Sequence, residues 1–185
     1  MRPTFITTLA RIAVVGAGSL ACAFAAHAAG DKTAYENAKA SATSTYEAAS
    51  KRCDAMSGNA RDVCVAEAKA ARTTTEENAR AAYEGTPKAR AHAKEEIADA
   101  NYKVARERCD ERTGNDRDVC IKVAKAERTR AKADAKAHRK TVEARQDADK
   151  DKREAEYNVA AQKCDALSGD ARSACVKDAK ARYGM

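Results

Sequence analysis

Six cysteines recur as three pairs with identical spacing. The members of each pair stand eleven positions apart, and the pairs are Cys53 with Cys64, Cys109 with Cys120, and Cys164 with Cys175. Such pairs can form disulfides, or they can bind a soft metal ion such as Cu(I) or Zn(II) through thiolates. Metal motifs usually place two ligands two to four residues apart and gather four ligands, so the spacing favours disulfides. Because no Cys-x-x-Cys motif is present, oxidoreductase activity is not expected.

The first part of the chain bears on the redox compartment of these cysteines. Arg2 and Arg11 are the only charged residues among the first 30, an apolar stretch covers 12–26, and Ala26-His27-Ala28 has the small-x-small form of a cleavage site. This pattern predicts a secretory signal peptide over 1–28, followed by no transmembrane segment, because a spanning helix needs about 20 apolar residues. The expected location is therefore periplasmic or secreted, where disulfides form.

The cysteine pairs belong to an internal repeat of 56 and then 55 residues, measured between Gly58, Gly114 and Gly169. Before the first glycine, apolar residues recur at steps of three and four and so lie on one helical stripe, which consists of Tyr46, Ala49, Cys53 and Met56. A second helical pattern follows each glycine. Each block therefore predicts two helices joined by a tight corner, with the two cysteines facing each other near the bend.

Local signals at the corners refine this prediction. Each glycine is expected to be the left-handed residue that ends the first helix. The residue after it, which is Asn59, Asn115 or Asp170, is expected to cap the second helix. Three tyrosines at one repeat position, Tyr46, Tyr102 and Tyr157, are predicted to be the largest apolar groups inside the hairpins.

Between the corners the pattern changes. Gly85-Thr86-Pro87 ends one helix and begins the next, whereas 116–166 contains neither Gly nor Pro. This second stretch predicts one continuous helix of about 51 residues and about 75 Å. The predicted fold is all-α, with three disulfide-tipped helical hairpins joined by long Ala/Lys/Glu-rich helices in an elongated shape. The predicted boundaries are a signal peptide at 1–28 and hairpin repeats at 29–84, 85–140 and 141–185.

The predicted mature chain has few large apolar residues, and Leu167 is its only leucine. Each disulfide closes a loop of about 12 residues, which corresponds to about 3 kcal/mol in the chain-entropy model. The three disulfides are therefore expected to replace a large apolar core as the source of stability.

A basic segment between corners two and three is the other candidate site. Six cations, Arg128, Arg130, Lys132, Lys136, Arg139 and Lys140, surround one acidic residue, Asp134. They could bind a polyanion such as an anionic envelope surface, or they could form an ordinary solvated helix face. Nucleic acid is not an expected partner, because the segment has no aromatic residue and the protein is predicted to be exported. His92 and His138 are expected to be surface residues. No catalytic residue, metal or cofactor is predicted.

The unit Cys-Asp-x-x-(Ser/Thr)-Gly-(Asn/Asp)-x-Arg-x-x-Cys, set in Ala/Lys-rich helices after a signal peptide, resembles small secreted proteobacterial proteins often labelled TolA-like or cell envelope biogenesis. The resemblance implies a place in the cell envelope. The expected function is that of a non-enzymatic periplasmic structural or adaptor protein, with envelope proteins or an anionic envelope surface as partners. The alternative is a polyanion- or metal-binding protein of envelope stress. The residues indicate no particular oligomeric state.

Overall fold

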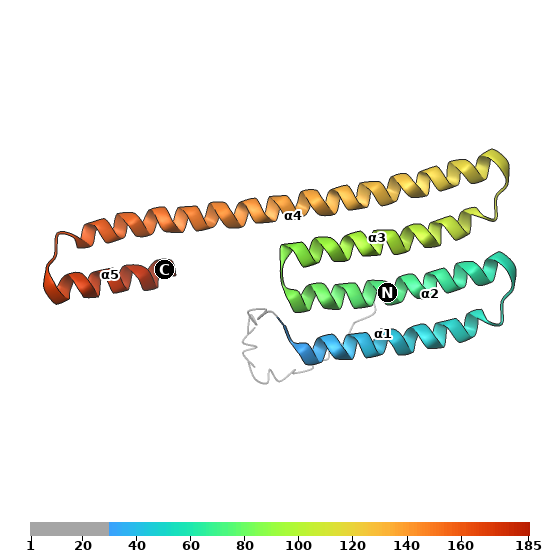
Figure 1. Ribbon diagram of the computed structural model, residues 1–185, viewed down its shortest axis with the longest axis horizontal. Helices are drawn as coiled ribbons and strands as arrows, with labels where there is room; N and C mark the ends of the chain where they lie inside the picture. The colour runs from blue at the N-terminus through green and yellow to red at the C-terminus, as the bar shows by residue number, and fades with distance from the viewer. Residues whose placement is uncertain (1–29) are drawn as a thin grey trace, which may run out of the picture.

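The computed structural model describes residues 30–185, so the predicted signal peptide lies outside the described residues (Figure 1). Over this part of the chain the fold consists of five helices and no strands. The helices are α1 (Lys32–Cys53), α2 (Gly58–Glu84), α3 (Pro87–Cys109), α4 (Gly114–Cys164) and α5 (Gly169–Tyr183). The predicted all-α fold is confirmed, and α4 has the 51 residues expected of it. None of these helices has the length and apolarity needed to cross a membrane.

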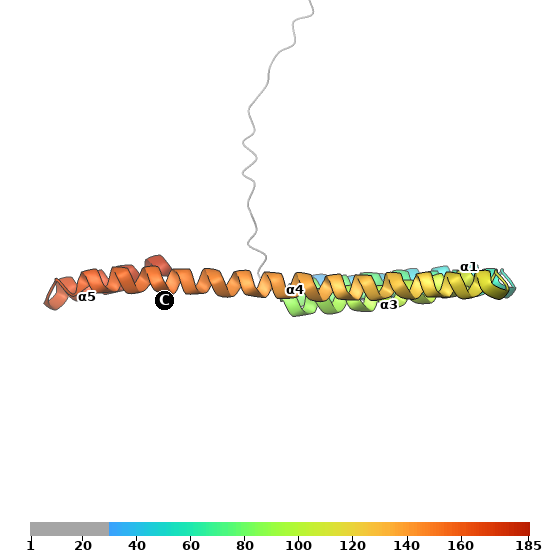
Figure 2. The ribbon, with the colours of Figure 1, turned by 90° about the horizontal axis from the view of Figure 1, so that it is seen from above.

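The helices form a single layer. Among the described helices, each packs only against its neighbours in the chain, α1 on α2, α2 on α3, α3 on α4, and α4 on α5. Figure 2 views the layer from its edge, where α1 to α4 lie in one plane. Figure 1 shows that α4 continues well past the beginning of α3, and that α5 folds back along its far end. No described helix therefore covers either broad face of the layer.

The flat arrangement follows from where the small residues lie on α3. Ala100 and Val104 pack with Ala70 of α2, whereas Tyr102 and Cys109 line the seam with α4. At 100° per residue these two stripes lie about 140 to 180° apart around the helix axis. A helix with two opposite packing stripes holds one neighbour on each side, so consecutive helices continue in one plane.

Most of the buried residues in the described part of the chain are alanines. Among residues 30–185, those less than 9% exposed are alanines, Val104 and three half-cystines. The largest side chains that are fully buried are Cys53, Cys109 and Cys164, one at each corner. Met56, expected on the buried stripe, and Leu167, which holds the same position in the third repeat, are 47% and 44% exposed. That expectation was wrong because the helix has already ended three residues earlier, at the cysteine.

The corner glycines have the expected conformation in a different role. Gly58, Gly114 and Gly169 have φ of 58°, 57° and 56°, in the left-handed region. The preceding helix has by then ended at its cysteine, and the glycine is the first residue of the next helix. The predicted caps were wrong, because the N-cap positions are Ser57, Thr113 and Ser168, none of which makes a side-chain capping hydrogen bond. A Cβ at these glycines would meet no atom within 4 Å, so backbone conformation, rather than space, selects glycine.

The connection between α2 and α3 matches its prediction. Gly85 ends α2 with φ of 65°. The Thr86 hydroxyl accepts a hydrogen bond of 3.0 Å from the Ala89 amide, and Pro87 is the first residue of α3. The predicted domain boundary at 85 therefore coincides with a helix boundary. The boundary at 140/141 lies inside the continuous α4.

Candidate functional site

The three corners are each closed by a disulfide. Cys53–Cys64 and Cys109–Cys120 have Cα atoms 5.6 Å apart, and Cys164–Cys175 has them 5.7 Å apart. The pairing is the one predicted. A disulfide sulfur carries no thiolate, so the oxidised corners do not present the ligands that a soft metal ion requires. Disulfides of this kind are consistent with a secreted or periplasmic protein.

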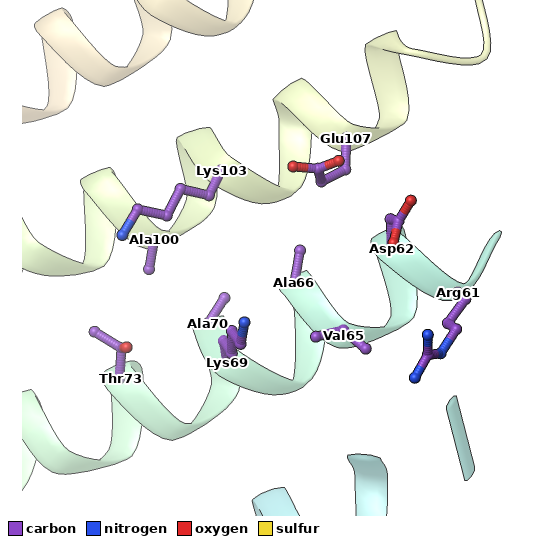
Figure 3. Close-up of a pocket in the computed structure, with 10 residues that line it drawn as sticks. All are labelled: Arg61, Asp62, Val65, Ala66, Lys69, Ala70, Thr73, Ala100, Lys103 and Glu107. Carbon is purple, nitrogen blue, oxygen red and sulfur yellow. The ribbon is translucent and has the colours of Figure 1, made fainter. Parts of the chain in front are cut away.

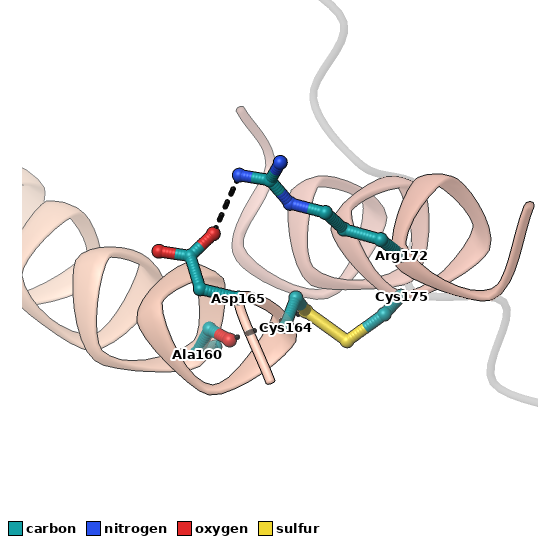
Figure 4. Close-up of a disulfide and its surroundings, with 5 residues drawn as sticks. All are labelled: Ala160, Cys164, Asp165, Arg172 and Cys175. Carbon is teal, nitrogen blue, oxygen red and sulfur yellow. Dashed lines mark hydrogen bonds and ion pairs between the residues drawn. A yellow bond between two sulfur atoms is a disulfide. The ribbon is translucent and has the colours of Figure 1, made fainter. Parts of the chain in front are cut away.

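An Arg–Asp hydrogen bond, which was not predicted from the sequence, also spans each of the three corners. The aspartate after the first cysteine accepts a hydrogen bond from an arginine seven residues later: Arg61 to Asp54 at 3.1 Å, Arg117 to Asp110 at 2.8 Å, and Arg172 to Asp165 at 2.6 Å. Figure 4 shows this pair beside the Cys164–Cys175 disulfide. The repeat motif contains both residues, so their recurrence at each corner is the signal that identifies them. These exposed pairs are worth at most about 1 kcal/mol each, so the disulfide dominates.

Of the repeated tyrosines, Tyr46 and Tyr102 line the seams of their hairpins, but each lies against a cation and not in the purely apolar interior that was expected. The guanidinium carbon of Arg72 lies 4.7 Å from the centre of the Tyr46 ring, and that of Arg128 lies 5.3 Å from the Tyr102 ring. Both tyrosines are half-buried. Each ring therefore stacks beneath a cation from the partner helix and covers the alanine seam near its corner.

One carboxylate joins α3 to α4. Asp99 accepts hydrogen bonds from Arg128 at 2.5 Å and from Lys132 at 2.9 Å. Partial burial alone would raise the pKa of Asp99, but the hydrogen bonds and positive charges of Arg128 and Lys132 outweigh it, and the pKa falls below 3.8. The same contact raises the pKa of Arg128. Asp99 is therefore ionised whenever the seam is formed at neutral pH.

The predicted polyanion-binding residues are largely engaged within the fold. Arg128 and Lys132 bind Asp99, Arg130 pairs with Glu127 at 2.6 Å, and Arg139 pairs with Glu143 at 3.9 Å. Lys136 and Lys140 are exposed, and neither has an acidic partner within 4 Å among residues 30–185. The basic segment is thus partly a set of interhelix and intrahelix links.

The two histidines lie apart. Nδ1 of His92 is 2.5 Å from Nη2 of Arg80 and 3.8 Å from a Glu77 carboxylate oxygen, so the ring sits at the α2–α3 seam, half exposed. His138 is exposed on α4. No nucleophile lies at hydrogen-bond distance from either ring among the described contacts.

A groove of about 420 Å³ lies along the seam between α2 and α3 (Figure 3). Ala66 and Ala70 point into it from α2, and Ala100 points toward them from α3. Side chains of both charge signs surround this alanine floor: Arg61, Asp62, Lys69, Lys103 and Glu107. The groove is open along its length, and its rim charges are mixed, so it selects no ligand charge.

The middle of α4 is uncovered. Every residue from 144 to 156 is exposed, and nine of these thirteen residues are charged. This stretch, here called the bare segment, lies between the part of α4 that packs on α3 and the part that packs on α5 (Figure 1). Its helix is supported by its own side chains, including the Lys152–Asp149 pair at 3.6 Å.

No family model, curated protein or solved structure matches this chain.

Proposed function

We propose that this protein is a non-enzymatic structural spacer or adaptor of the bacterial cell envelope, located in the periplasm. The observation that carries the proposal is α4, a single helix that joins two parts of the molecule across the bare segment, each of which is closed by its own disulfide. One end of α4 belongs to the four-helix layer, and the other end forms a hairpin with α5. A helix of 51 residues holds these ends about 75 Å apart.

The corners support this role because they keep both ends of α4 intact. A helix frays from its ends, where the terminal backbone groups have no intrahelical partner. In this chain one end of α4 is bonded through Cys120 to α3, and the other end is bonded through Cys164 to α5. Fraying from either end would therefore have to proceed past a disulfide. The exposed acidic and basic residues of the bare segment keep it soluble without a partner helix.

Shortening the bare segment tests the proposed spacing. Deleting residues 144–150 removes seven residues. This shortens α4 by about 10 Å and rotates one end of the helix relative to the other by only about 20°, because seven residues make nearly two full turns. The matched control replaces the same seven residues by a different exposed helix-forming heptad. In cells that lack the native gene, we expect the control to restore resistance of the envelope to detergent and the deletion variant to restore less. Equal rescue by both would overturn the spacer role.

Binding to an anionic envelope surface is the second candidate. The exposed Lys136 and Lys140, which have no acidic partner in the described chain, favour it. Salt-sensitive binding to anionic vesicles that is lost on replacing both lysines by Gln would support this candidate. Retention of binding by that variant would exclude this pair as the site.

A further inference from the structure

The outer edge of α4 repeats a helix surface that is buried elsewhere in the same molecule. Positions on α4 correspond to positions on α2 at the repeat spacing of 56. Ala70 of α2 is buried against α3, and its counterpart Ala126 is exposed. Ala126 lies about 160 to 200° around α4 from Ala124 and Arg128, which line the seam with α3. The side of α4 away from α3 is therefore the counterpart of the side of α2 that binds α3.

The correspondence extends along both helices. Four residues that share this side of α2 recur unchanged on α4: Val63 as Val119, Ala70 as Ala126, Thr73 as Thr129, and Ala81 as Ala137. On α2, Ala70 and Ala81 are buried and the other two are half-buried, whereas all four α4 counterparts are exposed. Val119 is 48% exposed. Helix α4 thus presents a packing surface that has no partner among the described helices.

We propose that a second copy of this chain covers this edge with the outer side of its α1. Helices α1 and α4 form the two edges of the four-helix layer and run in opposite directions (Figure 1). A copy placed beside the first by translation within the layer brings its α1 antiparallel to α4, as α3 lies antiparallel to α2. The contact extends the α2–α3 packing pattern from one molecule to the next.

Charges at the proposed contact are complementary when the register of the α2–α3 seam is applied. In that seam, Arg80 contacts His92 at 2.5 Å. The repeat counterparts of these two residues are Lys136 on α4 and Glu36 on α1. A second correspondence comes from Ala66 and Lys103, which line one groove and have Lys122 and Glu47 as counterparts. The register therefore places Lys136 opposite Glu36, and it brings Lys122 and Glu47 to the same stretch of the contact.

An alternative pairing of α4 with α4 of a second copy is disfavoured by charge. The part of α4 from 114 to 140 carries nine basic and four acidic side chains, so two such edges would repel each other. The α1–α4 contact joins two different surfaces, and such a contact leaves one free edge at each end of the pair. Association is therefore expected to produce stacks that grow with protein concentration. This inference adds a partner to the proposed spacer role and rests on its single-layer architecture.

Sedimentation equilibrium of the oxidised protein over a wide concentration range tests the contact. We expect the average mass to rise with concentration, and Lys136→Glu and Glu36→Lys each to weaken association about fivefold or more, because each turns an attraction into a repulsion. An equimolar mixture of the two variants should again form stacks, in which the two variants alternate, because each variant's α4 edge then faces an α1 edge of opposite charge. Ala126→Glu, which prevents close helix approach, should weaken association more than about tenfold.

Matched controls lie on the bare segment of the same helix, where Lys150→Glu and Ala144→Glu make the same changes away from the edge. Wild-type protein that remains monomeric at all concentrations would overturn the proposal. So would edge variants that associate as their controls do. Either result leaves the spacer proposal intact, because that proposal is judged by the length of α4 and by rescue of the envelope.

Discussion

Removal of the central disulfide gives the most direct measure of what the corners contribute. Cys109→Ala/Cys120→Ala opens a loop whose ends are eleven residues apart in sequence, with Cα atoms at 5.6 Å. The chain-entropy model assigns about 3 kcal/mol to closure of a loop of about 12 residues. Alanine preserves helix propensity, and the Arg117–Asp110 pair that remains contributes at most about 1 kcal/mol. Most of the loss is therefore expected to appear in the measured free energy of unfolding.

Thermal unfolding followed by circular dichroism at 222 nm is the assay. For a chain of this size, a loss of about 3 kcal/mol corresponds to a fall in Tm of about 6 to 12 °C, with little change in helix content before the transition. Wild-type protein with reduced thiols should show a larger fall, because all three bridges are open. An unchanged Tm in the double variant would refute the reasoning that loop closure replaces a core in this fold.

The third corner supplies a matched comparison. Cys164→Ala/Cys175→Ala opens an equivalent loop, but among the described helices α5 packs only on α4, so its release leaves the α1–α4 layer intact. Amide hydrogen exchange should rise in α5 and in the last turns of α4 alone. In the central variant it should rise along α3 and the first half of α4. The same exchange pattern in both variants would show that the corners do not act locally.

Three further outcomes are expected. Asp99→Asn should lower the free energy of unfolding at neutral pH by about 1 kcal/mol. Because folding lowers the pKa of Asp99 below 3.8, this contribution is present above pH 3.8 and is lost as the pH falls through the folded-state pKa. The urea unfolding curves of the variant and the wild type should therefore converge in acid, and also in high salt. Gly114→Ala should lower the free energy of unfolding by about 1 to 2 kcal/mol, because φ at this position is 57° and no steric contact adds to the conformational cost. A change near zero in urea unfolding would contradict the role assigned to this glycine. Ala148→Pro should break α4 in the bare segment and shorten the maximum dimension measured by small-angle scattering. The control Ala148→Ser should keep the maximum dimension of the wild type. Equal dimensions for the two variants would show that α4 does not hold the ends apart.

Features that depend on near neighbours in the chain were predictable. The pairing of Cys53 with Cys64, the left-handed conformation of Gly58 and the capping of α3 by Thr86 each involve residues within about one dozen positions. The length of α4 was predictable as well, because a stretch without Gly or Pro and rich in good helix formers has no local reason to stop. The exact place of each corner was not, because the helices end at the cysteines, before the glycine that the pattern marked.

Contacts between distant residues required the tertiary structure. Asp99 meets Arg128 and Lys132 across 29 and 33 positions, and nothing in a chain this rich in charge distinguishes these partners beforehand. The predicted basic site illustrates the consequence, since Arg128 serves the α3–α4 seam and the Tyr102 ring. The Arg–Asp pair at each corner was only partly predictable. Its two residues recur in every repeat, but their contact depends on how the chain bends at the corner.

The sequence by itself therefore determined the helices, the three stapled corners and the continuous α4, because propensity, glycine conformation and loop closure act over short separations. Tertiary structure alone decided that α1 to α4 form one flat layer, that residues 144–156 stay uncovered, and that the outer edge of α4 is exposed while its counterpart on α2 is buried. The physical reason is that every helix carries similar stripes of alanine, so the sequence does not indicate which stripes pack together. Which of them meet depends on the direction in which each corner turns and on the long-range charge pairs, such as Asp99 with Arg128, that fix the register.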